Sequence, residues 1–156
     1  MVDKKNENIV HITQQRWANV VLNIGKAYKK KASLDNLISE LLHNIYAFNY
    51  CDVLFKPTLA KYHQFRSTKE EFTSYFLGQN KVCEEDNGFA IKNWKSIEFE
   101  NYKIVQLNDY LLSMGNYYFI DNKDQSLKVE YTFGFIKVGN NELRINLHHS
   151  SLPYKG

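Results

Sequence analysis

The sequence predicts an α+β fold, in which helices from the first half of the chain pack on one face of a curved antiparallel sheet built from the second half. Apolar residues recur at helical spacing up to about residue 77, whereas alternating segments separated by turn residues follow from about residue 89. Aromatic residues make up 15% of the 156 residues, as is typical of a sheet curved around a cavity. A genome rich in A and T would explain the eleven tyrosines equally well.

Three amphipathic patterns predict the helices, which are expected at residues 11–30, 34–45 and 68–77. Residues 1–10 are polar and are expected to form a flexible tail. Ser33 is the expected N-cap of the second helix. Ser67 and Glu70 have the spacing of a capping box at the start of the third. Because no linker or internal repeat is visible, residues 11–156 are expected to form a single domain.

Alternating segments predict the strands. A short strand at residues 50–55 is expected to end before Pro57, since proline cannot donate a ladder hydrogen bond. A polar, acidic loop at residues 78–88 follows the third helix. The later strands are expected at residues 89–94, 95–100, 104–107, 110–120, 127–138 and 143–150. The two longest are separated by a short turn, which predicts a long hairpin.

Charge and composition exclude several classes of protein. The net charge is only +3, and the single basic run, Lys29-Lys30-Lys31, lies where it would oppose the dipole of the first helix, so no nucleic-acid partner is expected. Cys51 and Cys83 lack CxxC spacing and are expected to be reduced. No apolar run has transmembrane length, so no membrane partner is expected. The chain is therefore expected to be soluble and cytoplasmic, unless a leader peptide was removed.

The last strand carries the densest group of chemically active side chains. Successive residues of a strand point to opposite faces. One face is expected to carry Arg144, Asn146, His148 and Ser150, and the other Ile145, Leu147, His149 and Ser151. Two histidines on opposite faces of a regular strand cannot bind one metal ion. The polar face either contacts water or lines a polar cavity, and the alternation does not decide between these two interpretations.

Other positions carry hydroxyl or carboxyl groups of interest. Tyr75 lies among apolar helix residues, so its hydroxyl needs a partner, either a backbone group or a ligand. Thr58 follows Pro57 at a bend where its side chain can turn inward. Glu130 lies in a strand, and we expect a structural role for it. No Gly-x-Ser-x-Gly motif is present, so acyl-enzyme chemistry is not expected.

Seven motifs in a fixed order resemble the iota-class carbonic anhydrases. They are Phe55-Lys56-Pro57-Thr58-Leu59-Ala60, Arg66-Ser67-Thr68, Tyr75-Phe76, Gly88-Phe89-Ala90-Ile91 with Trp94, Met114-Gly115-Asn116-Tyr117-Tyr118-Phe119, Lys128-Val129-Glu130-Tyr131-Thr132-Phe133-Gly134-Phe135 and Leu147-His148-His149-Ser150-Ser151-Leu152-Pro153. The resemblance covers about residues 17–154. This family is related to the association domain of calcium/calmodulin-dependent protein kinase II and has the nuclear transport factor 2-like fold.

The resemblance implies a cone-shaped half-barrel whose helices close a pocket, with a homodimer formed through the sheet. It also implies reversible hydration of carbon dioxide to bicarbonate. Members are metal-free in some lineages and metal-dependent in others. The opposite orientation of the paired histidines favours a site without cofactor, and a divalent metal such as zinc or manganese is the alternative.

By the same resemblance, Thr58, Tyr75 and Ser150 are expected to hold the bicarbonate or the attacking water, and His148 to relay the proton. The other polar residues of the last strand are expected to contact substrate: Arg144, Asn146, His149 and Ser151. His148 and Ser150 are preferred for the catalytic roles because they share a face with Arg144 and Asn146. A β-bulge near the strand end would reverse this choice.

Two other functions use the same fold. One is a non-catalytic association module that assembles subunits into rings, or a module that binds a small acid. The other is a small-molecule isomerase or hydrolase, which would normally need a carboxylate base in the cavity. Glu130 is the strand carboxylate available for that role.

Overall fold

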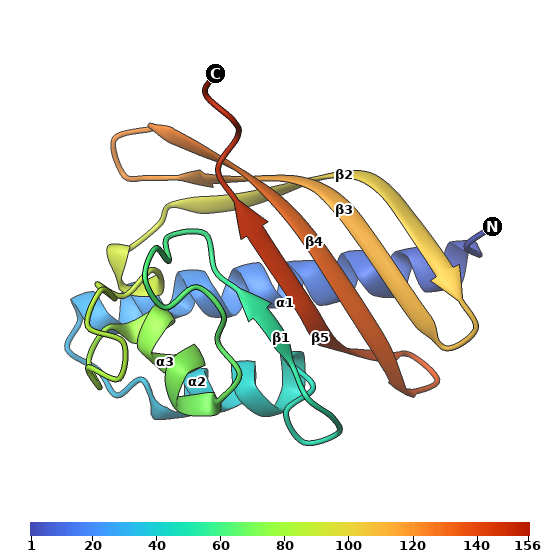
Figure 1. The fold of residues 1–156 in the computed structure, drawn as a ribbon, viewed down its shortest axis with the longest axis horizontal. Helices are drawn as coiled ribbons and strands as arrows, with labels where there is room; N and C mark the ends of the chain where they lie inside the picture. The colour runs from blue at the N-terminus through green and yellow to red at the C-terminus, as the bar shows by residue number, and fades with distance from the viewer.

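Five strands form one curved sheet that does not close, and the helices pack on one of its faces (Figure 1). The computed structural model describes residues 1–156. The helices are α1 (Lys4–Lys29), α2 (Asp35–Glu40) and α3 (Lys69–Leu77), with a π-helix at Leu41–Ile45 and a 3-10 turn at Ala90–Lys92. The strands are β1 (Leu54–Lys56), β2 (Ser96–Leu107), β3 (Tyr110–Ile120), β4 (Ser126–Gly139) and β5 (Glu142–Ser151). The predicted α+β class with an open, curved sheet is therefore confirmed.

The order of the strands is β1-β5-β4-β3-β2, and β1–β5 is the parallel pair. β3 and β4 form the long hairpin that the sequence predicted, with Tyr117 opposite Val129. β1 lies at the edge beside β5, where Phe55 is opposite His148. Because these two strands run in the same direction, the residues that follow β1 lie beside the end of β5.

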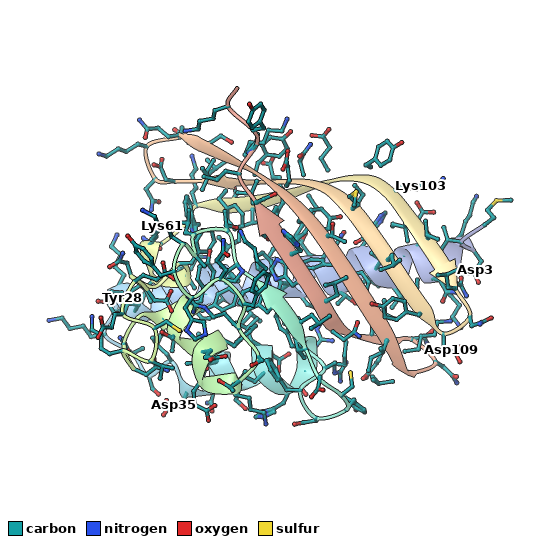
Figure 2. All side chains as sticks on the ribbon, viewed as in Figure 1. Asp3, Tyr28, Asp35, Lys61, Lys103 and Asp109 are labelled. Carbon is teal, nitrogen blue, oxygen red and sulfur yellow. The ribbon has the colours of Figure 1, made fainter.

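The core lies between the sheet and the helices, where side chains from both layers meet (Figure 2). Odd-numbered residues of β3 and β4 share the inner face of the sheet, since side chains alternate along a strand. The buried ones are Leu111, Ser113, Tyr117, Phe119, Val129, Tyr131, Phe133 and Phe135. Trp17 of α1 packs on this layer, with ring centroids 5.7 Å from Tyr117 and 6.1 Å from Phe133. Aromatic contacts therefore join α1 to the centre of the sheet.

Helix α1 begins at Lys4, so the expected start at residue 11 is wrong and residues 4–10 are the first turns of the helix. Asp3 is the N-cap, and its carboxylate accepts a hydrogen bond from the Asn6 N–H at 2.7 Å. Ile9 and Val10 are buried and extend the apolar stripe towards the N-terminus. The predicted tail therefore contains residues that pack on the core.

Residues 34–45 do not form the single helix that was expected. α2 ends at Glu40 and the π-helix follows, so that the Tyr46 N–H donates to the Leu41 carbonyl at 2.8 Å, five residues earlier. Tyr46 then pairs with Ile145 of β5 as an isolated parallel bridge. The Ser33 hydroxyl accepts the Asp35 N–H at 3.3 Å, although the N-cap position belongs to the next residue.

The segment at residues 89–94, expected as a strand, contains the 3-10 turn instead. This turn packs against α1 at Gly25, where any side chain would overlap the backbone of Ala90 and Asn93. The close approach of two backbones requires glycine there. The capping box of α3 lies one residue later than expected, at Thr68 and Glu71.

Two other strands differ from the prediction in extent. The two strands expected at residues 95–100 and 104–107 are parts of one strand, β2, which begins at Ser96 and is interrupted by a β-bulge between Asn101 and Lys103. The strand expected at residues 50–55 is reduced to the three residues of β1.

The expectations for cysteines and the basic run agree with the structure. Cys51 is exposed, Cys83 is buried, and both thiols are free. Lys29 lies in the last turn of α1, where positive charge opposes the helix dipole. None of the helices combines the length with the hydropathy that a transmembrane span requires.

Candidate functional site

A β-bulge in β5 decides which residues of this strand face the core. Ile145 pairs with Phe135 and Leu147 pairs with Gly134, so Asn146 is one extra residue on β5. Side chains after the bulge therefore shift by one position relative to those before it. Ile145, His148 and Ser150 consequently share the buried face, with exposed fractions of 0%, 2% and 1%.

The predicted grouping of Arg144 and Asn146 with His148 and Ser150 is therefore wrong. A regular strand would place all four on one face, but the bulge lies between the two pairs. The choice of His148 and Ser150 as the inward residues is nevertheless correct, because His149 is exposed and Ser151 is only half-buried.

The inward end of β5 borders a small cavity that brings together Thr58, Tyr75, His148 and Ser150. The complete lining is Trp17, Phe55, Pro57, Thr58, Tyr75, Phe76, Phe89, Tyr117, His148 and Ser150. The volume open to the centre of a water molecule is ≈ 10 Å³. That is close to the minimum needed for one water molecule. The four residues that the sequence predicted as catalytic therefore converge on one narrow space, with room for about one water molecule.

Each wall of the cavity comes from a different element. β1 runs parallel to β5 and directs Pro57 and Thr58 towards Ser150, while the Lys56 ammonium donates to the Ser150 carbonyl at 3.0 Å. α3 is amphipathic and places Tyr75 on its buried side. The Tyr75 hydroxyl accepts the Leu59 N–H at 3.4 Å. Thr58 and Tyr75 both border the cavity.

Buried charges hold the loop that carries Thr58. Arg66 is fully buried and donates to both carboxylate oxygens of Asp86, at 2.7 and 2.8 Å. Glu85 accepts hydrogen bonds from three successive backbone N–H groups of the loop, those of residues 61, 62 and 63. These contacts connect the loop after β1 to the loop after α3. Bidentate pairs of this kind fix geometry as well as supplying energy.

Tyr117 and Tyr46 also contact the catalytic candidates, and sequence reasoning missed both. Tyr117 of β3 contacts the Ser150 hydroxyl and lies 3.1 Å from His148 Nε2. Tyr46 lies 2.7 Å from His148 Nδ1. Tyr117 belongs to one of the resembling motifs, but its place on an apolar face suggests a core ring. Tyr46 follows a helix and has no sequence signal of its own.

The cavity contains no charged group near neutral pH. Burial lowers the pKa of His148 to about 3, and the charge of His149 contributes in the same direction. Burial raises the pKa of Tyr75 and Tyr117 well above the ordinary value of 10.0. The proton-relay role expected of His148 depended on an ordinary histidine pKa, which burial removes. His148 and the two phenols are therefore neutral hydrogen-bonding groups.

The residues predicted to contact substrate lie elsewhere. The Arg144 guanidinium donates to the Leu143 carbonyl at 3.0 Å and to the Glu142 carboxylate at 3.1 Å. The Asn146 side chain lies beside the Tyr110 phenol. Neither residue lines the cavity.

His149 and Ser151 border a hollow on the outer face of the sheet. The Ser151 hydroxyl donates to Glu130 at 2.9 Å, which gives Glu130 the structural contact expected of it. Neither His149 nor Ser151 lines the inner cavity.

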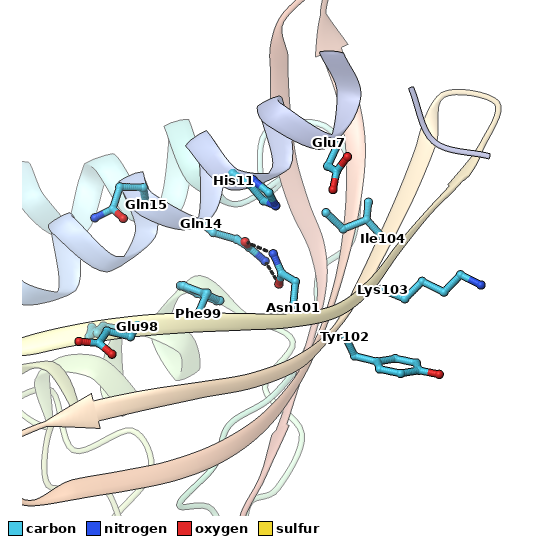
Figure 3. Close-up of a pocket in the computed structure, with 11 residues that line it drawn as sticks. Glu7, His11, Gln14, Gln15, Glu98, Phe99, Asn101, Tyr102, Lys103 and Ile104 are labelled. Carbon is cyan, nitrogen blue, oxygen red and sulfur yellow. Dashed lines mark hydrogen bonds between the residues drawn. The ribbon is translucent and has the colours of Figure 1, made fainter. Parts of the chain in front are cut away.

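The largest hollow of the molecule, ≈ 650 Å³, lies between α1 and β2 (Figure 3). Its amides satisfy each other, because Gln14 donates to Asn101 at 2.9 Å and accepts from it at 2.8 Å. Gln14 also donates to the Tyr131 hydroxyl at 2.9 Å. His11 borders this hollow, but no buried nucleophile or second histidine accompanies it. We therefore place the site at the smaller cavity, despite the difference in volume.

The chain is similar to metal-independent carbonic anhydrases along nearly its whole length. The sequence model of the metal-independent carbonic anhydrase family matches residues 8–152. A metal-independent carbonic anhydrase of Nostoc sp. is 36% identical over 152 residues, which cover 96% of this chain and 74% of the relative.

Solved structures share the fold. The crystal structure of an iota-carbonic anhydrase from a cyanobacterium, complexed with bicarbonate, has a TM-score of 0.90 at 33% identity, covering 96% of this chain and 93% of that one. A protein from Xanthomonas campestris, described as a calcium/calmodulin-dependent protein kinase II association domain, has a TM-score of 0.64 at 19% identity, with coverages of 94% and 87%. At that identity the second likeness concerns the fold alone.

Proposed function

Because the chain belongs to the metal-independent carbonic anhydrase family, a family of lyases, we propose that its own cavity hydrates carbon dioxide reversibly to bicarbonate. The observation that carries this proposal is the convergence of five neutral polar side chains on one small space walled by aromatic rings. Those side chains are Thr58, Tyr75, Tyr117, His148 and Ser150. The family is metal-independent, so the reaction requires no metal cofactor.

The aromatic walls of the cavity contact carbon dioxide, and the hydroxyl groups form hydrogen bonds with the reacting oxygens. Carbon dioxide is small and apolar, and rings such as those of Phe55 and Phe89 offer it a matching surface. As water attacks the carbon, negative charge develops on the oxygens. Tyr75 and Ser150 donate hydrogen bonds to these oxygens, while Thr58 orients the water. Burial favours the neutral phenol of Tyr75, so it remains a donor throughout.

The reaction also releases one proton, since carbon dioxide and water become bicarbonate and H⁺. His148 cannot take this proton near neutral pH, because burial lowers its pKa to about 3. We propose that the proton leaves past Tyr75 and Phe89, which border both the cavity and a neighbouring hollow lined by Glu85 and Lys92. Water in that hollow is the expected first acceptor.

Two substitutions test the site directly. Ser150→Ala and Tyr75→Phe each remove one donor and should lower kcat for hydration about 100- to 1,000-fold, the usual effect of losing one oxyanion donor. Ser151→Ala is the matched control, because its hydroxyl contacts Glu130 on the outer face and its loss should leave kcat unchanged. Stopped-flow measurement of carbon dioxide hydration compares the three. Full activity in both Ser150→Ala and Tyr75→Phe would refute the proposed site.

We also propose that the outer face of the sheet contacts a second copy of the chain. Met114 and Tyr102 border the hollow on this face with exposed fractions of 54% and 82%, and Leu54 at the edge strand is 68% exposed. Apolar side chains at such exposure favour association. Sedimentation of the wild type should give twice the chain mass, and Met114→Glu should give the monomer. A wild type that sediments as a monomer would refute this contact.

A further inference from the structure

The π-helix presents Tyr46 to the catalytic strand. Its wide turn ends at Tyr46, and the next residue, Ala47, donates its N–H to the Ile145 carbonyl at 2.8 Å. The Tyr46 ring is fully buried, with its centroid 4.5 Å from that of Phe72. π-helical turns occur frequently at functional sites. Here the turn anchors a phenol immediately beside the β-bulge that orients His148.

Tyr46 occupies the middle of a chain of three buried polar groups. The Trp17 indole N–H donates to the Tyr46 oxygen at 2.9 Å, and this oxygen lies 2.7 Å from His148 Nδ1. An indole can only donate, whereas a neutral imidazole has one nitrogen that donates and one that accepts. The Trp17 indole therefore always donates to the Tyr46 oxygen, and this limits the direction of the hydrogen bond between Tyr46 and His148.

The Tyr46 hydroxyl hydrogen has one acceptor within reach, which is His148 Nδ1. If Nδ1 carried a hydrogen, the Tyr46 oxygen would accept twice and its own hydrogen would be buried without a partner. A buried donor without a partner is unfavourable by about 1–3 kcal/mol. Burial raises the pKa of Tyr46 well above 10.0, so the hydroxyl keeps its hydrogen.

We infer that Tyr46, held by Trp17, is a positioning residue that fixes His148 in the tautomer with hydrogen on Nε2. The Nε2 atom lies 2.9 Å from the Ser150 hydroxyl and 3.1 Å from the Tyr117 hydroxyl. His148 then donates to one of these oxygens, and the hydrogen of that hydroxyl is directed away from the imidazole. In this arrangement the imidazole fixes the direction in which the Ser150 and Tyr117 hydroxyl groups donate, and it does not act as a base.

The catalytic consequence rests on the proposed hydration reaction, whereas the tautomer is a property of the resting protein. With Nε2 as the donor, the imidazole takes neither hydroxyl hydrogen. One of these hydrogens joins Ser150 to Tyr117, and the other is free to reach an oxygen of bicarbonate. With Nδ1 protonated, Nε2 would accept one of those hydrogens instead. The tautomer therefore sets how many donors face the substrate.

Nitrogen-15 NMR of protein labelled in its histidine rings tests the inference at pH 7. The His148 signals are identified by their loss in His148→Gln. In the wild type we expect Nε2 to carry the hydrogen and Nδ1 to have the shift of an unprotonated nitrogen. Tyr46→Phe keeps the buried ring and should lower the ratio of the two tautomers about 5- to 150-fold, because the preference of about 1–3 kcal/mol that the hydroxyl imposes is lost. Its kcat should fall in proportion to the fraction of His148 that keeps the hydrogen on Nε2.

Tyr131→Phe is the matched control, because it also removes a buried phenol but one that contacts Gln14, and the His148 signals should not change. A wild-type spectrum with the hydrogen on Nδ1, or one that Tyr46→Phe leaves unchanged, would overturn the inference. The wild-type spectrum decides the matter even if Tyr46→Phe does not fold. A protein with the expected tautomer but without hydration activity would instead contradict the proposed function and leave the inference standing.

Discussion

Acid should destabilise this protein through His148. The pKa of this side chain is 6.5 in an unfolded chain and about 3 in the folded protein, because burial disfavours the charged form. Between these values the unfolded state binds a proton that the folded state does not. The free energy of unfolding therefore decreases as the pH falls below 6.5, by about 1.36 kcal/mol per pH unit. At pH 5 the loss amounts to about 2 kcal/mol, and any folded pKa below about 4 gives nearly the same value.

Urea unfolding at pH 7 and pH 5 measures this loss. His148→Gln removes the titrating group, so the wild type should lose about 2 kcal/mol more than this variant between the two pH values. His149→Gln is the matched control, because the neighbouring residue is exposed, and it should lose as much as the wild type. Contributions from other groups cancel in the comparison. Equal losses in the wild type and His148→Gln would refute the claim that His148 is buried in its neutral form.

Three further predictions concern the cavity and its supports. The pH profile of kcat should show no step near pH 6.5 if His148 keeps its low pKa, and a step there in stopped-flow data would contradict the neutral cavity. Asp86→Ala should destabilise the protein by about 3–5 kcal/mol in urea, because it removes the bidentate partner of the fully buried Arg66, and a loss below about 1 kcal/mol would contradict this. Gly115→Ala should lower Tm strongly, since a Cβ there overlaps the backbone of β2. Gly139→Ala is the control and should leave Tm nearly unchanged, because a Cβ there meets no close neighbour. Equal Tm values for the two variants would contradict the close approach of the β2 and β3 backbones at Gly115.

Much of the fold follows from local patterns in the sequence. The long hairpin of β3 and β4 alternates over much of its length, and its turn residues mark its end, so its extent could be predicted closely. The start of α1 was missed because Asn6 and Glu7 give the segment a polar appearance, although Ile9 and Val10 continue the stripe. The π-helix before Tyr46 has no counterpart in the periodicity, because one extra residue in a turn leaves the apolar pattern nearly unchanged.

The site was predictable in part, and the reasons differ between its residues. The motifs led to Thr58, Tyr75, His148 and Ser150, which the structure brings together. The grouping of Arg144 with this set failed because a bulge depends on long-range pairing with β4 and leaves no local signal in β5.

Burial changes the chemistry expected of His148. A sequence gives the ordinary pKa of a histidine, whereas the folded environment sets the pKa that matters. Tyr117 was missed for a related reason, since an aromatic residue on an apolar face is usually a core ring. Its hydroxyl reaches the cavity only because β3 and β5 place it beside Ser150.

Hydration of carbon dioxide by the wild-type protein after exhaustive treatment with a chelator tests the metal-free cavity most directly. Metal content is measured on the same sample, and stopped-flow traces are recorded before and after treatment. We expect an unchanged kcat in protein free of metal, because neutral hydroxyl groups in the cavity supply the stabilisation. Activity that disappears with the metal and returns only when zinc or manganese is added would contradict it.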